Sequence, residues 1–80
     1  MASPTNLPTV TINSFGEVFF GGAEVTEVEL AGLVRQALAE SGQRTVVLRA
    51  DQGVLHGQSV RIMDIIRQAG AERIAIATGG

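Results

Sequence analysis

The segment LRADQGVLHGQS, residues 48–59, contains the residue types from which a small hydrolase builds an active site. His56 is the only histidine of the chain, Asp51 precedes it in the same loop, and Ser59 follows it. A hydrolase uses such a histidine to activate a nucleophile and a carboxylate to orient it. Ser59, however, falls in the first turn of a helix expected from Gly57, and no G-x-S-x-G motif is present. We therefore expect no catalytic residue here, a partly exposed His56, and structural turn residues at Asp51 and Gly57.

The glycines of this loop raise a second possibility, the binding of an anion. The stretch GVLHG precedes the expected helix, and the backbone amides of residues 57–59 could contact an anion at the helix N-terminus. Neither G-x-G-x-x-G nor G-x-x-x-x-G-K occurs in the chain. A standalone ligand- or anion-binding module that uses Gly57 to Ser59 is therefore kept as the alternative to the function inferred below.

Composition argues against several other functions. The chain has 80 residues, 45% of them hydrophobic, with no cysteine and a net charge of −2. One small domain with an aliphatic core is expected, without a metal site or a cofactor. The six positive charges are arginines dispersed along the sequence, without a basic cluster, so we expect no nucleic-acid partner. They are Arg35, Arg44, Arg49, Arg61, Arg67 and Arg73.

The ends of the chain look different from its middle. Residues 1–8 are polar, contain two prolines, and carry no signal-peptide features, so we expect a disordered linker or a remnant of a longer chain. The folded domain is expected over residues 9–78, followed by a tail at 79–80. No stretch approaches the roughly 20 apolar residues that span a bilayer.

Hydrophobic periodicity predicts six elements. Two short strands, 9–13 and 17–20, flank a glycine turn and suggest a hairpin that ends at the glycine pair 21–22. A helix follows at 26–42, where Thr26 and Glu29 have the spacing of a capping box. A strand at 44–51, a helix at 57–69 and a strand at 73–78 complete the chain.

This order, β-β-α-β-α-β, predicts an α+β fold. Each helix has one apolar stripe, and the strands alternate instead of being apolar on both sides. We therefore expect two helices packed on one face of a small mixed sheet, with the other face open. Ile74 and Ile76 should point toward the helices, and Ala75 and Ala77 away from them.

The last strand, RIAIAT, is the candidate partner-binding element. It is rich in β-forming residues and carries no charge after Arg73. An exposed strand edge accepts strands from other chains, whereas an interior strand does not, and the pattern leaves both positions open. The candidate partner-binding residues are Arg73, Ala75, Ala77 and Thr78.

Taken together, these segments resemble a known family. The ordered set is V-x-I-N-x-x-G-x-V-F-x-G-G, the capped helix, V-V-L-R-A-D, and V-x-x-G-x-x-V-x-I-M-D-I-I-R-Q-A-G-x-x-R-I-A-I-A-T. From about Val10 to Thr78 it resembles the periplasmic domain of the ExbD/TolR family of biopolymer transport proteins. The most specific part is Arg49-Ala50-Asp51, with Met63-Asp64 and Ala69-Gly70 downstream.

The resemblance implies a function without catalysis. Family members have one transmembrane helix in the bacterial inner membrane, form homodimers, and place this domain in the periplasm. They work with an ExbB- or TolQ-like channel protein, and the proton motive force then drives a TonB- or TolA-like partner that supports outer-membrane transport or integrity. The family's proton-handling aspartate lies in the transmembrane helix, so Asp51 and Asp64 are not that residue. His56 stands where the family often has a tyrosine, and we note a pH-sensitive contact there as a hypothesis.

Overall fold

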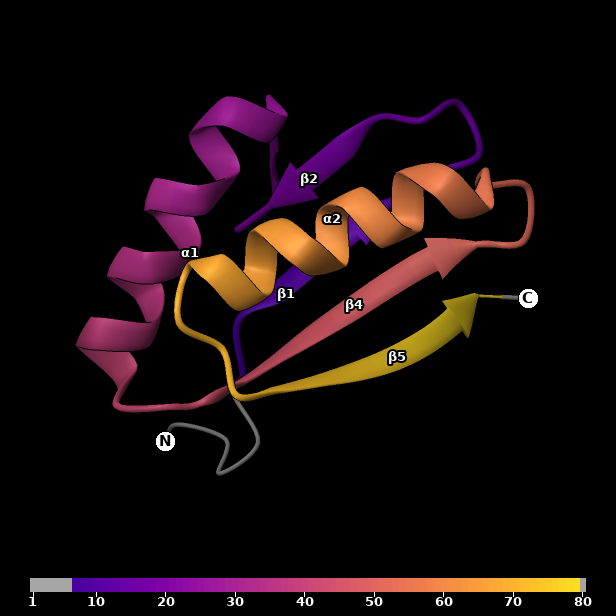
Figure 1. Cartoon of the computed structure of the whole chain (residues 1–80). Helices are drawn as coiled ribbons and strands as arrows, with labels where there is room; N and C mark the ends of the chain where they lie inside the picture. Colours follow the sequence, from indigo (N-terminus) through magenta and orange to yellow (C-terminus); the bar gives the residue numbers. More distant parts are fainter. Residues whose placement is uncertain (1–6, 80) are drawn as a thin grey trace.

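The computed structural model describes residues 7–79, and for residues 78 and 79 only the backbone. Seven elements follow one another along the chain (Figure 1). They are β1 (Thr9–Ile12), β2 (Val18–Phe20), β3 (Ala23–Val25), α1 (Glu27–Ser41), β4 (Thr45–Asp51), α2 (His56–Gln68) and β5 (Arg73–Gly79).

The five strands form one mixed sheet in the order β3-β2-β1-β4-β5. β1, β4 and β5 run parallel, while β2 is antiparallel to both β1 and β3. Both helices lie over the same face of the sheet (Figure 1). The predicted α+β fold, with two helices on one face of a small mixed sheet, is therefore confirmed.

One strand was missing from the prediction. The chain does not leave the sheet after β2 but turns at Gly21 and Gly22, with φ angles of 64° and 84°, and returns as β3. Positive φ at both central positions is the geometry of a tight two-residue hairpin turn. β3 has only three residues and no alternating pattern, so no strand is predicted there from hydrophobic periodicity.

A single aliphatic cluster holds the two layers together. It combines one face of the central strands with one stripe of each helix, as the alternation predicted. The fully buried side chains include Val10, Ile12, Leu30, Val34, Val46, Leu48, Ile62 and Ile66. Burial of each such side chain contributes about 1.5–3 kcal/mol.

The folded part extends beyond the expected limits of 9 and 78 at both ends. The Pro8 carbonyl oxygen accepts a hydrogen bond of 2.8 Å from the Val47 amide, which continues the β1–β4 pairing. At the other end, β5 pairs with β4 as far as Gly79. Of the expected linker and tail, residues 1–6 and 80 lie outside the described part.

Candidate functional site

β5 forms one edge of the sheet, which answers the question that its sequence left open. Its only neighbour within the described sheet is β4, to which it is parallel over seven residue pairs. The Arg73 amide donates to the Arg44 carbonyl at 3.1 Å. Because successive strand residues direct their backbone groups to opposite sides, Ala75 and Ala77 also bond toward β4. The N–H and C=O groups of Ile74 and Ile76 therefore point to the free edge.

Side chains alternate between the two faces of β5. Ala75 and Ala77 are paired with Val47 and Arg49, and these two alanines are exposed on the open face, as predicted. Ile76 is paired with the buried Leu48 and so lies on the helix side.

Ile76 points toward the helix side, as expected, but 60% of it is exposed. α2 covers the more central strands and leaves the end of β5 open (Figure 1). Sequence alternation gives the face on which a side chain lies, but it does not show where the covering helix ends.

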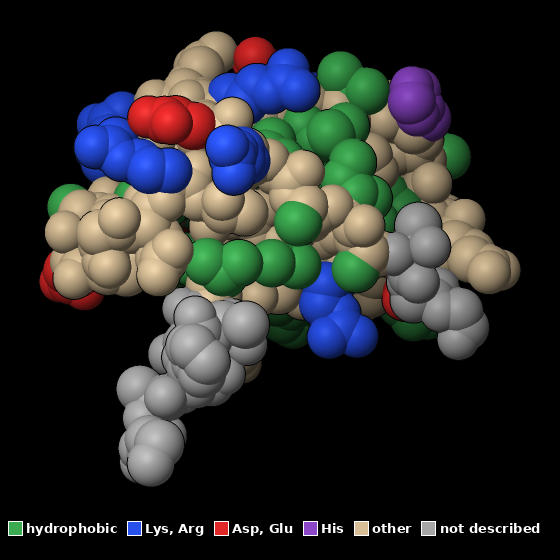
Figure 2. Space-filling model, turned by 90° about the horizontal axis from the view of Figure 1, so that it is seen from below, with side chains coloured by type: hydrophobic (Ala, Val, Ile, Leu, Met, Phe, Trp, Pro, Cys, Tyr) green, Lys and Arg blue, Asp and Glu red, His purple; other side chains and the backbone are tan. Residues whose placement is uncertain are grey.

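The surface beside this edge is also apolar. Val60 on α2 is 47% exposed, and Met63 is half-buried. Figure 2 looks onto the edge and shows hydrophobic side chains gathered along β5 and over the neighbouring part of α2. Of the four partner-binding candidates, Arg73, Ala75 and Ala77 are exposed along this strand, and the Thr78 backbone is paired with Ala50. An added strand would thus find unpaired backbone groups beside apolar side chains.

The loop that contains Asp51 and His56 joins β4 to α2. Asp51 is the last residue of β4, and its backbone carbonyl accepts the Val54 amide at 3.1 Å, which makes the turn. No hydrogen bond or ion pair within residues 7–79 joins Asp51, His56 and Ser59, and this range contains no group of three His, Asp or Glu side chains that could hold a metal ion.

Gly57 is not a turn residue, which corrects its expected role. α2 begins at His56, one residue earlier than expected, and Gly57 lies within its first turn without a positive φ angle. Leu55 precedes the helix and provides no side-chain cap, but its carbonyl accepts the amides of Gln58 and Ser59 at 3.1 and 3.2 Å, so these two amides are already paired. Anion binding at Gly57–Ser59 remains a prediction.

Thr26 and Glu29 form the expected capping box at the start of α1. The Glu29 amide donates to Thr26 Oγ1 at 3.1 Å, and the Thr26 amide donates to Glu29 Oε1 at 2.9 Å. The pair satisfies two amides at the helix N-terminus and fixes where α1 begins.

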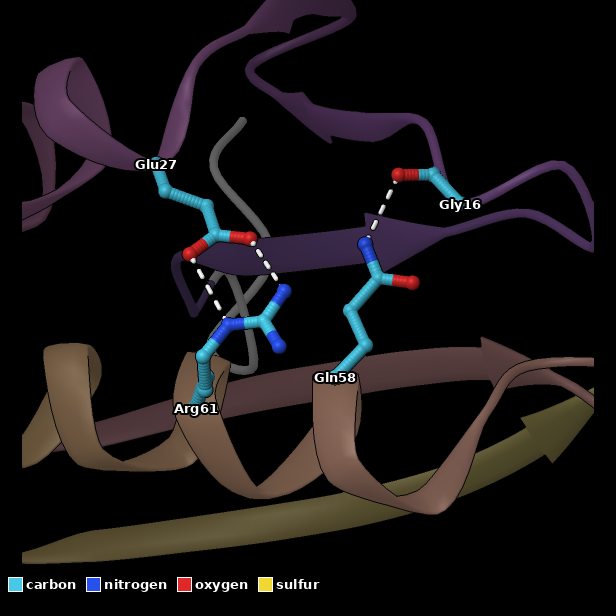
Figure 3. Close-up of polar contacts among 4 residues, drawn as sticks. All are labelled: Gly16, Glu27, Gln58 and Arg61. Carbon is cyan, nitrogen blue, oxygen red and sulfur yellow. Dashed lines mark hydrogen bonds and ion pairs between the residues drawn. The ribbon is translucent and has the colours of Figure 1, made fainter.

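Two contacts join segments that are far apart in the sequence, and no motif predicts them. Arg61 on α2 donates to Glu27 in the first turn of α1, and Gln58 donates to the Gly16 carbonyl at 2.7 Å (Figure 3). Together they attach α2 to α1 and to the β1–β2 turn. The partners are separated by 34 and 42 residues, and no local pattern signals such pairs.

The chain matches the family described as biopolymer transport protein ExbD/TolR, over residues 1–79. This match covers nearly the whole chain. The chain belongs to the ExbD/TolR family. A similar protein is the biopolymer transport protein ExbD of Pseudomonas aeruginosa, 33% identical over 69 residues, which are 86% of this chain and 52% of that protein. The resemblance inferred from the sequence motifs is thus confirmed.

This ExbD/TolR chain spans about half the length of the relative it matches. Within residues 7–79, neither helix has the length and apolar character needed to cross a membrane. Family membership supports a role in biopolymer transport.

Proposed function

We propose that this chain is the periplasmic domain of a proton-motive-force-driven energy-transducing complex of the ExbB-ExbD-TonB or TolQ-TolR-TolA type. In that role it forms a homodimer and binds a TonB- or TolA-like protein, and it catalyses no reaction. A single membrane anchor upstream of the domain contacts an ExbB- or TolQ-like channel protein in the inner membrane. The proposal rests on family membership and on the correspondence to about half of a curated ExbD protein.

The free edge of β5 is the observation that supports self-association and partner binding by the domain. A seven-residue edge strand with outward N–H and C=O groups can pair with a strand of another chain. Two copies related by a twofold axis would join their β5 strands antiparallel and form one continuous sheet. Arg73, Ala75, Ala77 and Thr78 would then lie at or next to the contact.

Replacement of Ile76 tests pairing at this edge. Ile76→Pro removes an N–H that points away from β4, so the β4–β5 hydrogen bonds are kept, and proline is tolerated on edge strands. Ile76→Ala keeps the N–H and removes most of the side chain. We expect sedimentation equilibrium to show weaker self-association for Ile76→Pro than for Ile76→Ala. Equal self-association of the two variants and the unaltered chain would exclude backbone pairing at β5.

The open face is tested separately. Ala75→Lys places a charge on the exposed side of β5 while leaving its backbone unchanged. If partners also cover this face, the dimer fraction or the binding of a TonB- or TolA-like periplasmic fragment should fall. An unchanged result for both measurements would limit the contact to the strand edge.

The proposed anchor is tested most directly at the gene. An apolar segment of about 20 residues with one aspartate, encoded upstream of Ser3, is expected. A reading frame that starts at Met1 would contradict the membrane-bound motor role and favour the ligand-binding alternative.

A further inference from the structure

The arginines, dispersed along the sequence, gather at one end of the folded domain. Dispersal along the sequence therefore does not exclude a cluster in the fold. Figure 2 shows most of the visible arginine side chains gathered at one end of the surface, with acidic groups among and beside them and another arginine lying apart. The cluster, called here the arginine end, consists of Arg35, Arg44, Arg67 and Arg73.

Backbone contacts account for this gathering. Arg44 precedes β4 and its carbonyl accepts the Arg73 amide at 3.1 Å, so the starts of β4 and β5 lie side by side. Arg35 on α1 and Arg44 line one hollow together with Gly70. The Gly70 amide donates to the Arg67 carbonyl at 3.0 Å, which places the end of α2 there as well.

The arginine end carries more positive than negative charge. Glu72 lies among the arginines, 3.8 Å from Arg44, but both side chains are about 70% exposed. Exposed pairs of this kind are weak and leave the guanidinium available to other anions. Asp64 and Glu40 lie at its margins, and each accepts a hydrogen bond from a glutamine of its own helix.

Outside the arginine end, negative charges outnumber positive ones. Five acidic residues and only two arginines lie away from the arginine end. They are Glu17, Glu24, Glu27, Glu29 and Asp51, with Arg49 and Arg61. The domain therefore has an electrical polarity from one end to the other, although its net charge is only −2.

The chain enters the fold at the arginine end. β1, β4 and β5 are parallel and begin at this end, where the Pro8 carbonyl bonds to Val47. Leu7, the first described residue, therefore lies at this end. An upstream membrane anchor, as proposed above, would hold the arginine end next to the bilayer surface.

We propose that the arginine end docks on the anionic phospholipid headgroups of the membrane that holds the anchor. This inference rests on the proposed function, because the anchor provides the proximity. Guanidinium groups bind phosphate through charge-assisted hydrogen bonds, and each arginine near an anionic surface strengthens binding by about fivefold. Docking in this way fixes the domain upright, with the β5 edge at the side and the acidic end directed away from the membrane.

The test is binding of the 80-residue chain to vesicles of phosphatidylcholine alone or mixed with phosphatidylglycerol, measured by co-sedimentation at low salt. We expect binding only to the phosphatidylglycerol vesicles. The double variant Arg35→Gln/Arg67→Gln should bind about thirtyfold more weakly. Arg67→Gln alone should bind about fivefold more weakly, and Arg49→Gln, the matched loss of one charge outside the arginine end, should bind like the unaltered chain. Circular dichroism verifies that each variant is folded.

Three results would overturn the proposal: no binding to phosphatidylglycerol, equal binding to both vesicle types, or full binding by the double variant. Spin-labelled headgroups add a second readout, since they should broaden amide signals at the arginine end and not at the acidic end. Self-association, measured without lipid, separates this proposal from the proposed function. A chain that dimerises through β5 and ignores phosphatidylglycerol would refute lipid docking alone.

Discussion

Arg61 on α2 and Glu27 at the start of α1 form a two-point ion pair. Arg61 Nη2 lies 3.0 Å from Glu27 Oε2, and Arg61 Nε lies 3.3 Å from Oε1. The hydrogen bond from Arg61 to Glu27 and the attraction between their charges raise the pKa of Arg61 above its ordinary value. The negative charge also lies at the positive end of the α1 dipole, so one carboxylate stabilises both a helix terminus and a contact between helices.

A double-mutant cycle of Glu27→Gln and Arg61→Gln should detect this pair. We expect each single variant to unfold slightly more easily, and the double variant to lose less than the sum. Coupling should fade in about 1 M salt, where the Debye length is about 3 Å. Urea unfolding followed by circular dichroism measures it, and a coupling insensitive to salt would contradict an ionic origin.

The same pair has a defined pH dependence. Because the pKa of Arg61 is raised in the folded state, its contribution is fully present below the ordinary arginine pKa and is lost only as the pH rises through the raised value. Titration of Arg61 should thus leave stability unchanged from neutral pH to strong alkali. Arg49→Gln is the control for this pH dependence, because Arg49 has no ion pair among the described residues.

Ile66 and Ile76 should respond very differently to truncation. Ile66 is fully buried between α2 and the sheet, so Ile66→Ala should lower the free energy of unfolding by about 2–5 kcal/mol. Ile76 is 60% exposed, so Ile76→Ala should cost about 1 kcal/mol or less. Denaturant unfolding of the two variants compares them directly. Similar losses would mean that β5 is covered in solution, for example by self-association.

Loss of the Thr26 hydroxyl should weaken the start of α1. Thr26→Ala removes the acceptor for the Glu29 amide and should cost about 1 kcal/mol. Thr26→Ser keeps the oxygen and should retain nearly all of the stability. Thermal unfolding distinguishes the two, and equal losses would show that the cap hydrogen bond contributes nothing.

Local patterns were sufficient for most of the fold. Residue spacing alone predicts the buried stripe of Leu30, Val34 and Leu38 and the alternation that buries Val46 and Leu48. β3 was missed because three residues cannot show a period. The position of α2 also depends on side-chain contacts between residues that are 34 or more positions apart. The spacing of residues along the sequence does not reveal such contacts.

The candidate site was less accessible from the sequence. The β propensity of RIAIAT marked a strand, but its place at the sheet edge follows from the order of pairing. The arginine end illustrates the same limit, since Arg35 and Arg73 are far apart in sequence and belong to different layers. These charges come together because β4 and β5 are parallel and begin at the same end of the sheet, and because α1 and α2 each run back to that end.

Two glycines flanking the C-terminal half of α1 should respond to alanine in opposite directions. Gly32 lies on the exposed side of the helix, and no atom beyond its own helix lies within 4 Å of the place that a Cβ would occupy. Gly32→Ala should raise the free energy of unfolding by about 1 kcal/mol, since alanine loses less backbone entropy in a helix.

Gly42 is the counterpart because it ends α1 with a φ angle of 71°. A Cβ at this position strains the left-handed backbone that directs the chain into β4, although open space surrounds it. Gly42→Ala should therefore cost about 1 kcal/mol, and the two variants should move the urea midpoint in opposite directions. If Gly42→Ala were neutral, the end of α1 would have to adopt another conformation in solution, and the placement of Arg44 at the arginine end would change with it.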